Sequence, residues 1–278
     1  MDKLSTFQNT KNFGLVQLKR IVDENSSIGG ALKKWTFIKD DYKYYVKTFS
    51  KSSSGFGCYE CENECFVSEL FSLLGLPNVK YHLDEIVYGG VNYKVCISKD
   101  YAHGMPQITL YECVPGVSET KGKERYDDIV NYLPSIQEQL DKILIGDFII
   151  NNRDRHLHNL EIVVNSSGEI LLPCYDNGSS LFYNVRDKSL KLFYKLSWET
   201  SSCKPFYSSW GKQLSLVNLK NYSLNNVTPE EIRSLLVKYY SNKRSSLLLE
   251  FILSRLQILK DKGVNFIWLN HMIFITKP

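Results

Sequence analysis

Apolar and aromatic residues in the first third of the chain follow the short, turn-bounded pattern of β-strands. Leu32–Lys39 and Tyr42–Phe49 are rich in aromatic and β-branched side chains, and Asp40-Asp41 between them is a turn signal. Two further strands are predicted at Val79–Tyr88 and Asn92–Ser98, joined by a glycine pair that is typical of a hairpin turn. This part of the chain is therefore predicted to be rich in strands.

Elsewhere, apolar residues recur at helical spacing. Glu60–Leu74 is followed by Gly75, which suits the end of a helix. Tyr126–Ile150 carries its apolar residues on one stripe, and Ser245–Lys260 is another helical stretch. A capping box with proline at the first helical position begins at Thr228. Strands with one helix, followed by a mainly helical remainder, indicate an α+β fold.

Composition places the chain among ordinary folded proteins. Of its 278 residues, 43% are hydrophobic and 13% are aromatic, which is enough for a sizeable core. The net charge of +4 permits an anionic substrate such as a nucleotide, but it gives no case for direct binding of nucleic acid. No apolar run is long enough to span a membrane, and the N-terminus lacks the apolar core of a signal peptide. Seven cysteines, an odd number, fit reduced thiols and a cytoplasmic location.

Three of the cysteines, Cys58, Cys61 and Cys65, lie close together. A thiolate zinc or iron–sulfur site needs a fourth Cys or His at a recognisable spacing, and none follows them. We interpret the cluster as part of the helix that carries Glu64, and we expect no metal site made of cysteines.

The densest group of polar residues lies in the loop that follows Ile150. Phosphoryl transfer needs one carboxylate to orient the attacking hydroxyl, and an amide and a second carboxylate to hold Mg²⁺ against the nucleotide phosphates. Asp154 and Asn159 lie five residues apart, so a short loop keeps both within one cleft. Asp176 follows a predicted hairpin, and Gly178 is expected to let the chain turn sharply away. We interpret Asp154 as the residue that orients the nucleophile, and Asn159 and Asp176 as metal ligands.

A lysine that grips the phosphates is expected from the strands. Lys47 lies in the middle of its predicted strand among apolar neighbours, much like the strand lysine of protein kinases. The carboxylate that steadies such a lysine belongs on the following helix. Glu64 is our choice there, and Glu60 and Glu62 are the alternatives.

A glycine-containing loop precedes these strands. Ser26 and Ser27 are followed by Gly29 and Gly30, and backbone amides in such a loop can form a nest for phosphates. The loop is not GxGxxG, so it supports a nucleotide site only together with the residues above. His156 and His158 are interpreted as structural or positioning residues, because phosphoryl transfer leaves little covalent work for a base.

Taken in order, these motifs resemble those of the HipA-like serine/threonine kinases, which share a distant protein-kinase-like fold. The resemblance rests on the run Asp147-x4-Asn152-x-Asp154-Arg155-His156-x2-Asn159 with Tyr175-Asp176 after it, on the loop from Ser27 to Lys33 or Lys34, and on Asn63-Glu64 opening a helix. It implies a bilobal fold, and we place the β-rich N-lobe at residues 1–104 and the helical C-lobe at 105–278.

The same resemblance implies ATP and Mg²⁺ as cofactors, with Asp154 as catalytic base, Asn159 and Asp176 on the metal, and Lys47 on the phosphates. It also implies autophosphorylation of Ser27, with Ser26 as the alternative, which would eject the loop and switch the kinase off. Family members act on aminoacyl-tRNA synthetases or on themselves, so a protein substrate is expected. The chain resembles the short, core-kinase form without the extra N-terminal subdomain of full-length HipA toxins, which leaves pairing with a DNA-binding antitoxin open.

Two other interpretations stay open. A phosphoinositide kinase has a similar Asp-Arg-x3-Asn loop, although His156 and the serines of the glycine loop favour the HipA-like branch. A nucleotide-binding pseudokinase scaffold is the alternative outside enzymes. The presence of Lys47, Asp154, Asn159 and Asp176 together argues against it.

Overall fold

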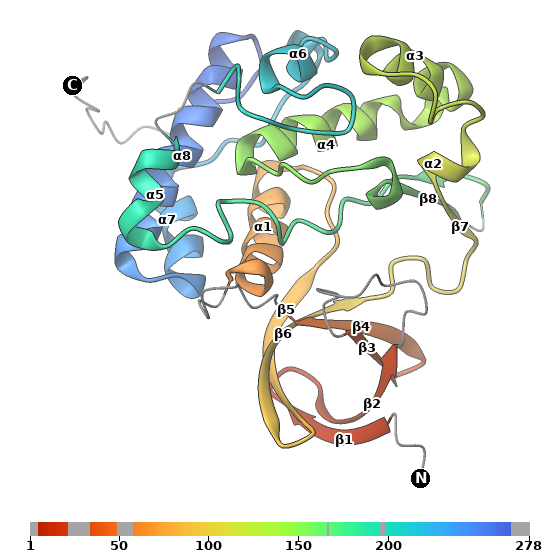
Figure 1. The fold of residues 1–278 in the computed structure, drawn as a ribbon, viewed down its shortest axis with the longest axis vertical. Helices are drawn as coiled ribbons and strands as arrows, with labels where there is room; N and C mark the ends of the chain where they lie inside the picture. Colours follow the sequence, from red (N-terminus) through yellow and green to blue (C-terminus); the bar gives the residue numbers. More distant parts are fainter. Residues whose placement is uncertain (1–4, 22–33, 49–57, 166, 195–197, 268–278) are drawn as a thin grey trace.

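A computed structural model describes residues 5–21, 34–48, 58–165, 167–194 and 198–267 of the chain. Strands β1 to β6 gather at one end of the molecule and most helices at the other, with α1 between them and β7 and β8 beside α2 (Figure 1). The strands are β1 (Ser5–Thr10), β2 (Gly14–Ile21), β3 (Lys34–Lys39), β4 (Tyr42–Thr48), β5 (Tyr81–Tyr88), β6 (Val91–Lys99), β7 (Gln107–Thr109), β8 (Glu161–Val164) and β9 (Ile170–Leu171).

The helices follow mainly after β7. They are α1 (Glu60–Leu74), α2 (Leu110–Cys113), α3 (Gly122–Tyr132), α4 (Gln137–Ile150), α5 (Asp187–Tyr194), α6 (Trp210–Leu214), α7 (Pro229–Tyr239) and α8 (Asn242–Asp261), with 3₁₀ turns η1 (Pro134–Ile136), η2 (Leu157–Asn159) and η3 (Leu219–Asn221). Within the described ranges, none of these helices has the length and apolar character needed to cross a membrane.

The larger sheet has six antiparallel strands in the order β1-β2-β3-β4-β6-β5. Asp40 and Asp41 form the tight turn between β3 and β4, with left-handed φ angles of 50° and 62°. Gly89 and Gly90 do the same between β5 and β6, with φ angles of 61° and 75°. The four predicted strands are confirmed within the described residues: the ends that can be compared agree or differ by one or two residues. Leu32, Lys33 and Phe49 of the predicted strands lie outside the described residues. Strands β7, β8 and β9 form a separate small sheet.

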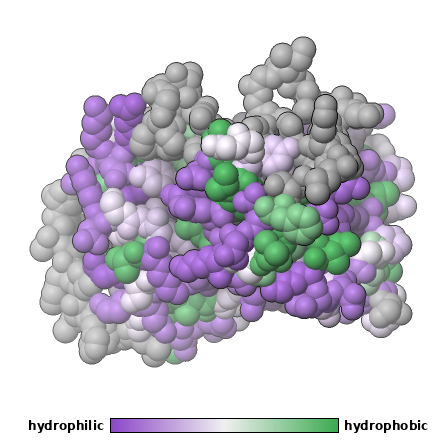
Figure 2. All heavy atoms as spheres, turned by 90° about the horizontal axis from the view of Figure 1, so that it is seen from below, coloured by the Kyte–Doolittle hydropathy of each residue, from purple (hydrophilic) through white to green (hydrophobic). Residues whose placement is uncertain are grey.

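The hairpin of β1 and β2 is a feature that the hydrophobic pattern does not predict. Val16 and Leu18 are buried, but Phe7 and Leu15 are 62% and 72% exposed. Because large apolar side chains point both inward and outward here, the alternation that reveals a half-buried strand is weak. Figure 2 shows the face at this end of the molecule, where hydrophobic side chains lie in small groups among hydrophilic ones.

The single helix expected over Tyr126–Ile150 is wrong, because the structure has two helices there. The first, α3, ends at Tyr132, and α4 begins at Gln137. Pro134 stands between them and disfavours the helical conformation of Leu133, whose φ and ψ are −130° and 68°. The other helix signals are confirmed: Gly75 ends α1 with a φ of 75°, and the Thr228 side chain caps α7.

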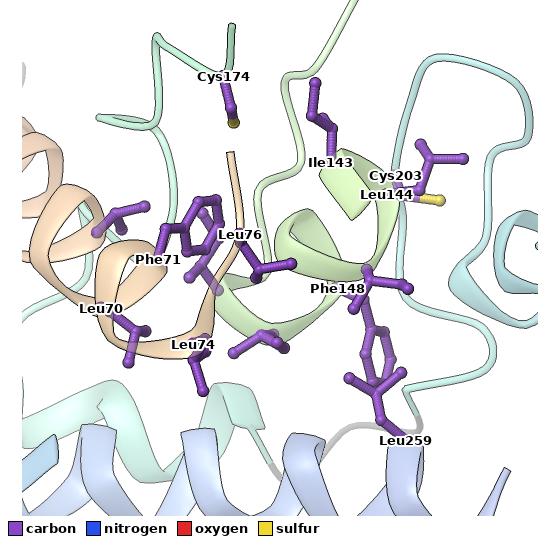
Figure 3. Packing of buried hydrophobic residues seen from close by; sticks show 14 of the residues in the cluster. Leu70, Phe71, Leu74, Leu76, Ile143, Leu144, Phe148, Cys174, Cys203 and Leu259 are labelled. Atoms are coloured by element: carbon purple, nitrogen blue, oxygen red, sulfur yellow. The ribbon is translucent and has the colours of Figure 1, made fainter. Parts of the chain in front are cut away.

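Within the described residues, the interior divides into three hydrophobic clusters. One, around Trp35, Val46 and Ile97, lies within the six-stranded sheet. The smallest joins Cys61 and Cys65 of α1 to Cys96 of β6. In the largest, Leu70, Phe71 and Leu74 of α1 belong to the same cluster as Leu144 and Phe148 of α4 (Figure 3). Although α1 follows the first strands in sequence, its apolar face therefore packs mainly with the helices.

Contact between α1 and α4 is close at one glycine. A Cβ atom at Gly146 of α4 would lie 2.6 Å from the Phe71 ring, so any larger residue there would have to push the ring aside. This close approach fixes the distance between α1, which carries Glu64, and α4, which ends at the polar loop.

Candidate active site

A cavity of about 380 Å³ lies between the six-stranded sheet and the helical part of the molecule. Lys47 of β4 lines it from the sheet, and Asn159 and Asp176 line it from the segments after α4 and β9. The fold thus brings together three residues that the sequence analysis assigned to the phosphates and the metal, although Lys47 and Asp176 are 129 positions apart.

Lys47 lies at the centre of this arrangement. Its Nζ donates to Asp176 Oδ1 at 3.2 Å and lies 3.7 Å from Glu64 Oε1. Burial alone would lower the pKa of Lys47, but the acidic groups of Tyr81, Asp176 and Glu64 outweigh it and hold the pKa well above its usual value. The amine is therefore a fixed positive charge at the wall of the cavity.

Among the three candidate glutamates, Glu64 is the one that meets Lys47. Its other oxygen, Oε2, accepts from the backbone N–H of Asn177 at 2.9 Å, so Glu64 links β4 to the segment that carries Asp176. Burial raises the pKa of Glu64, and the neighbouring Lys47 ammonium opposes that change. Glu62 instead forms an ion pair with Lys94 at 2.7 Å. Glu60 opens α1, and its backbone oxygen lies against Gly178.

Asp176 is held in an unusual backbone conformation. Its φ of 59° lies in the left-handed region, and its side chain is 43% exposed toward the cavity. The Lys47 ammonium lowers the pKa of Asp176, which keeps the carboxylate ionised. The turn was expected at Gly178, but the left-handed residue is Asp176. Gly178 serves a different need, because a Cβ there would lie 3.2 Å from the Glu60 carbonyl oxygen.

The loop after α4 places Asp154 and Asn159 differently. Asn159 ends η2 and is half-buried, and within the described residues its side-chain amide has no hydrogen-bond partner. Asp154 does not line the cavity. Its side chain is 53% exposed and pairs with Lys204 at 2.8 Å, and its backbone N–H donates to Asn152 Oδ1 at 3.1 Å. Asp154 therefore faces solvent, whereas Asn159 faces the cavity.

A buried ion pair supports this loop, and the sequence analysis gave it no role. Asp147 and Arg155 have fully buried side chains, and the guanidinium donates from Nε and Nη2 to the two carboxylate oxygens at 2.9 Å each. Arg155 also donates to Asn177 Oδ1 at 2.6 Å and to the Tyr175 carbonyl. One side chain thus ties the end of α4 to the segment around Asp176. Its signal in the sequence was an aspartate in the last turn of α4 and an arginine inside the polar loop.

Two tyrosines and a glutamate also line the cavity, and the Lys47 amine lies 6.0 Å from the centre of the Tyr175 ring. The rings of Tyr101 and Tyr175 stack at 5.6 Å, and Tyr101 donates its hydroxyl to Glu161. Burial raises the pKa of both tyrosines, so they remain neutral hydrogen-bond donors. Sequence reasoning missed this group, since its members come from three separate segments.

Lys34 is a further cationic residue at the cavity. It lies on β3 directly opposite Lys47 in the strand register, and it lines the same space. The glycine loop before it, with Ser26, Ser27, Gly29 and Gly30, lies outside the described residues, so its predicted position over the phosphates stays a prediction.

His158 lines the cavity, and the centre of the His156 ring lies 5.8 Å from that of His158. Burial lowers the pKa of His156, which favours its neutral form. The His158 ring packs against Tyr111 at 4.2 Å between ring centres. The positioning role of these residues stays a prediction.

The residues available for a metal are oxygen donors. Across the described ranges there is no group of three or more His, Cys, Asp and Glu side chains that could hold a metal ion by themselves. Asn159 and Asp176 offer one amide and one carboxylate oxygen to the cavity, which fits a Mg²⁺ ion that takes its remaining ligands from phosphates and water. The residues therefore suit a metal that arrives with a nucleotide.

Comparison with known proteins adds evidence on the fold. No protein-family model matches the sequence, and no curated protein sequence matches it. Among solved structures, the Helicobacter pylori proinflammatory kinase CtkA has a similar fold, with a TM-score of 0.59 and 15% sequence identity. The match covers 88% of this chain and 95% of that chain. The protein therefore has a mixed fold of sheet and helices that is similar to a kinase structure over most of its length.

Proposed function

We propose that this chain is an ATP- and Mg²⁺-dependent serine/threonine protein kinase of HipA type. The proposal rests on one observation: Lys47 lies between Glu64 and Asp176 beside a cavity that Asn159 also lines. In this proposal residues 1–104 and 105–278 are the two lobes, and the nucleotide occupies the cavity between them. The fold shared with a kinase structure supports it.

Each residue then has a role that its surroundings allow. Lys47 binds the nucleotide phosphates, and Glu64 holds its amine in place from behind. Asp176 and Asn159 would hold Mg²⁺, which would neutralise charge on the phosphates. Because Asp176 pairs with Lys47, nucleotide binding has to compete with this ion pair.

Asp154 suits a substrate that comes from outside the molecule. Its carboxylate is half-exposed, so a serine or threonine hydroxyl of another protein can reach it. A carboxylate in this position accepts a hydrogen bond from the hydroxyl and takes its proton as the new O–P bond forms, while the bond from the γ-phosphorus to the bridging oxygen breaks and ADP leaves. Lys204 pairs with the carboxylate in the absence of substrate.

The direct test is transfer of labelled phosphate. The purified protein is incubated with γ-labelled ATP and Mg²⁺, alone and with a cell lysate, and labelled proteins are identified by mass spectrometry. The proposal expects label on this chain and on serine or threonine of a protein substrate, for which an aminoacyl-tRNA synthetase is the first candidate. Label found only in phosphoinositides would favour the lipid-kinase alternative. Binding of ATP with no transfer at all would favour a pseudokinase.

Asp176→Asn is expected to weaken Mg²⁺-dependent binding of ATP by about tenfold or more. A hard cation needs an anionic oxygen, and asparagine offers a neutral one of the same shape. Titration calorimetry with ATP, with and without Mg²⁺, measures the effect. Asp187→Asn is a control on another segment, since Asp187 pairs with Arg244 away from the cavity. An unchanged affinity for Mg-ATP in the Asp176 variant would contradict the metal assignment.

Ser27 is expected to carry phosphate after incubation with Mg-ATP, with Ser26 as the alternative site. A phosphoserine adds nearly two negative charges beside the nucleotide phosphates, so affinity for ATP should fall. Ser27→Asp should reproduce part of this loss, and Ser27→Ala should keep binding and remove the self-inhibition. Mass spectrometry and nucleotide titration measure both. Unmodified serines in a preparation that turns over ATP would contradict the regulation while leaving the kinase activity standing.

A further inference from the structure

A second hollow, larger than the candidate active site, lies beside α1. Its volume is about 770 Å³, and it is bordered by the β1–β2 turn, the start of β5, α1 and α7. Tyr81 lines both this hollow and the cavity that holds Lys47. None of the roles assigned above uses its other residues.

Two walls of the hollow are held in place by hydrogen bonds. On one side, Asp84 accepts from the backbone N–H groups of Lys11 and Asn12 at 3.0 and 3.1 Å, which pins the β1–β2 turn to β5. On the other side, Glu69 of α1 accepts from Lys238 at 2.7 Å and from the Tyr239 hydroxyl at 2.6 Å, which pins α7 to α1. The hollow is therefore formed before any partner arrives.

The floor and the rim of the hollow differ in character. Leu73, Leu83 and Leu235 line it and are only partly buried, so apolar surface is open to a ligand. Lys11 and Lys80 stand at its exposed edge. An apolar floor with a polar rim is the usual arrangement of a surface that binds another protein.

The charge of this hollow is unbalanced. Glu69 is the acidic residue that lines it, and Lys238 already neutralises that carboxylate. Hydrogen bonds from Lys238 and Tyr239 lower the pKa of Glu69 in spite of its partial burial, so the carboxylate stays engaged with them. Within the described part of the chain, Lys11 and Lys80 form no ion pair. Two positive charges are thus left for a partner to meet.

We propose that this hollow is a docking site for an acidic peptide segment of a partner protein. Apolar side chains of the segment would enter between Leu73, Leu83 and Leu235, and its carboxylates would meet Lys11 and Lys80. A segment that alternates leucine or phenylalanine with glutamate or aspartate has the required chemistry. The inference concerns binding alone, so it does not depend on the proposed kinase activity.

The test uses a fluorescein-labelled peptide that alternates leucine and glutamate, and a matched peptide with lysine in place of each glutamate. Fluorescence anisotropy should show binding of the acidic peptide by the full chain, weakening as salt is added. The basic peptide should bind at least about tenfold more weakly, because its charges repel those of the rim.

Two sets of variants locate the site. Lys11→Glu with Lys80→Glu should weaken binding of the acidic peptide by about tenfold or more, and Leu235→Ala should weaken it several-fold. The control is Lys188→Glu with Lys212→Glu, which makes the same change of charge at exposed positions on α5 and α6 and should leave binding unchanged. Equal binding of the two peptides, equal loss in both double variants, or no binding of the acidic peptide would overturn the proposal. So would self-association of the chain that the Lys11 and Lys80 variants abolish.

Discussion

Replacing Asp154 by asparagine is expected to lower the rate of phosphate transfer by at least about 10²-fold while leaving the protein as stable as before. The rate falls because the amide cannot take the proton of the attacking hydroxyl, and loss of a catalytic base has an effect of this size. Stability is spared because the side chain is 53% exposed and its ion pair with Lys204 is equally exposed. Such surface pairs contribute about 0–1 kcal/mol.

Three measurements separate this expectation from general damage. Transfer of labelled phosphate should fall, whereas the melting temperature and the affinity for Mg-ATP should stay close to those of the original chain. Asp261→Asn, at the exposed end of α8, is the control that removes one charge on another element. If the Asp154 variant keeps a substantial rate, Asp154 is not the residue that orients the nucleophile.

Replacing Arg155 by methionine is expected to destabilise the fold by about 3–5 kcal/mol, the usual cost of leaving one partner of a buried ion pair alone. The substitution leaves the Asp147 carboxylate fully buried without its bidentate partner. It also removes the donors to Tyr175 and Asn177. Thermal and urea unfolding measure the loss, and a large fall in melting temperature is the expected result.

A double-mutant cycle shows whether the pair is the cause. Asp147→Asn together with Arg155→Met removes both charges, so the double variant should be less destabilised than the sum of the two single variants. Arg155→Lys keeps the charge but not the planar fork, and it should fall between the original chain and Arg155→Met. Additive losses would mean that the two side chains act independently.

The sequence alone predicted those parts of the candidate site that depend on neighbouring residues in the chain. Strands β3 and β4 are short and bounded by turn residues, so the presence of Lys47 on β4 followed from the pattern, although Lys47 is the last but one residue of the described strand and not its middle. All three candidate glutamates lie on the same helix, so only the resemblance, through Asn63-Glu64, favoured Glu64 over Glu60 and Glu62. In the structure, Glu62 is paired with Lys94 and so is not the partner of Lys47. This pairing depends on the position of β6 against α1, which the sequence pattern does not give.

Other parts depended on contacts between distant segments. The pair of Asp147 and Arg155 spans the end of α4. The bonds from Arg155 to Tyr175 and Asn177 form only when the segment around Asp176 packs against this loop. The order of strands places β6 between β4 and β5, which no local pattern specifies. In contrast, the break between α3 and α4 could have been predicted from the sequence, because Pro134 lies within the apolar pattern that was interpreted as one helix.

The packing of α1 decides which parts of the molecule must move together. Phe66, Val67 and Phe71 are fully buried in the core that contains α4, whereas α1 meets the sheet through small and polar groups: Cys61 and Cys65, the Glu62–Lys94 ion pair, and the bond from the Tyr81 N–H to Ser68. A rocking motion of the sheet that kept the large core intact would have to exchange these small and polar contacts, and it would leave α1 with the helices. Glu64 would keep its bond to Asn177 while β4 carried Lys47 toward it or away from it. The distance between Lys47 and Glu64 would then act as a gauge of how far the cleft is open.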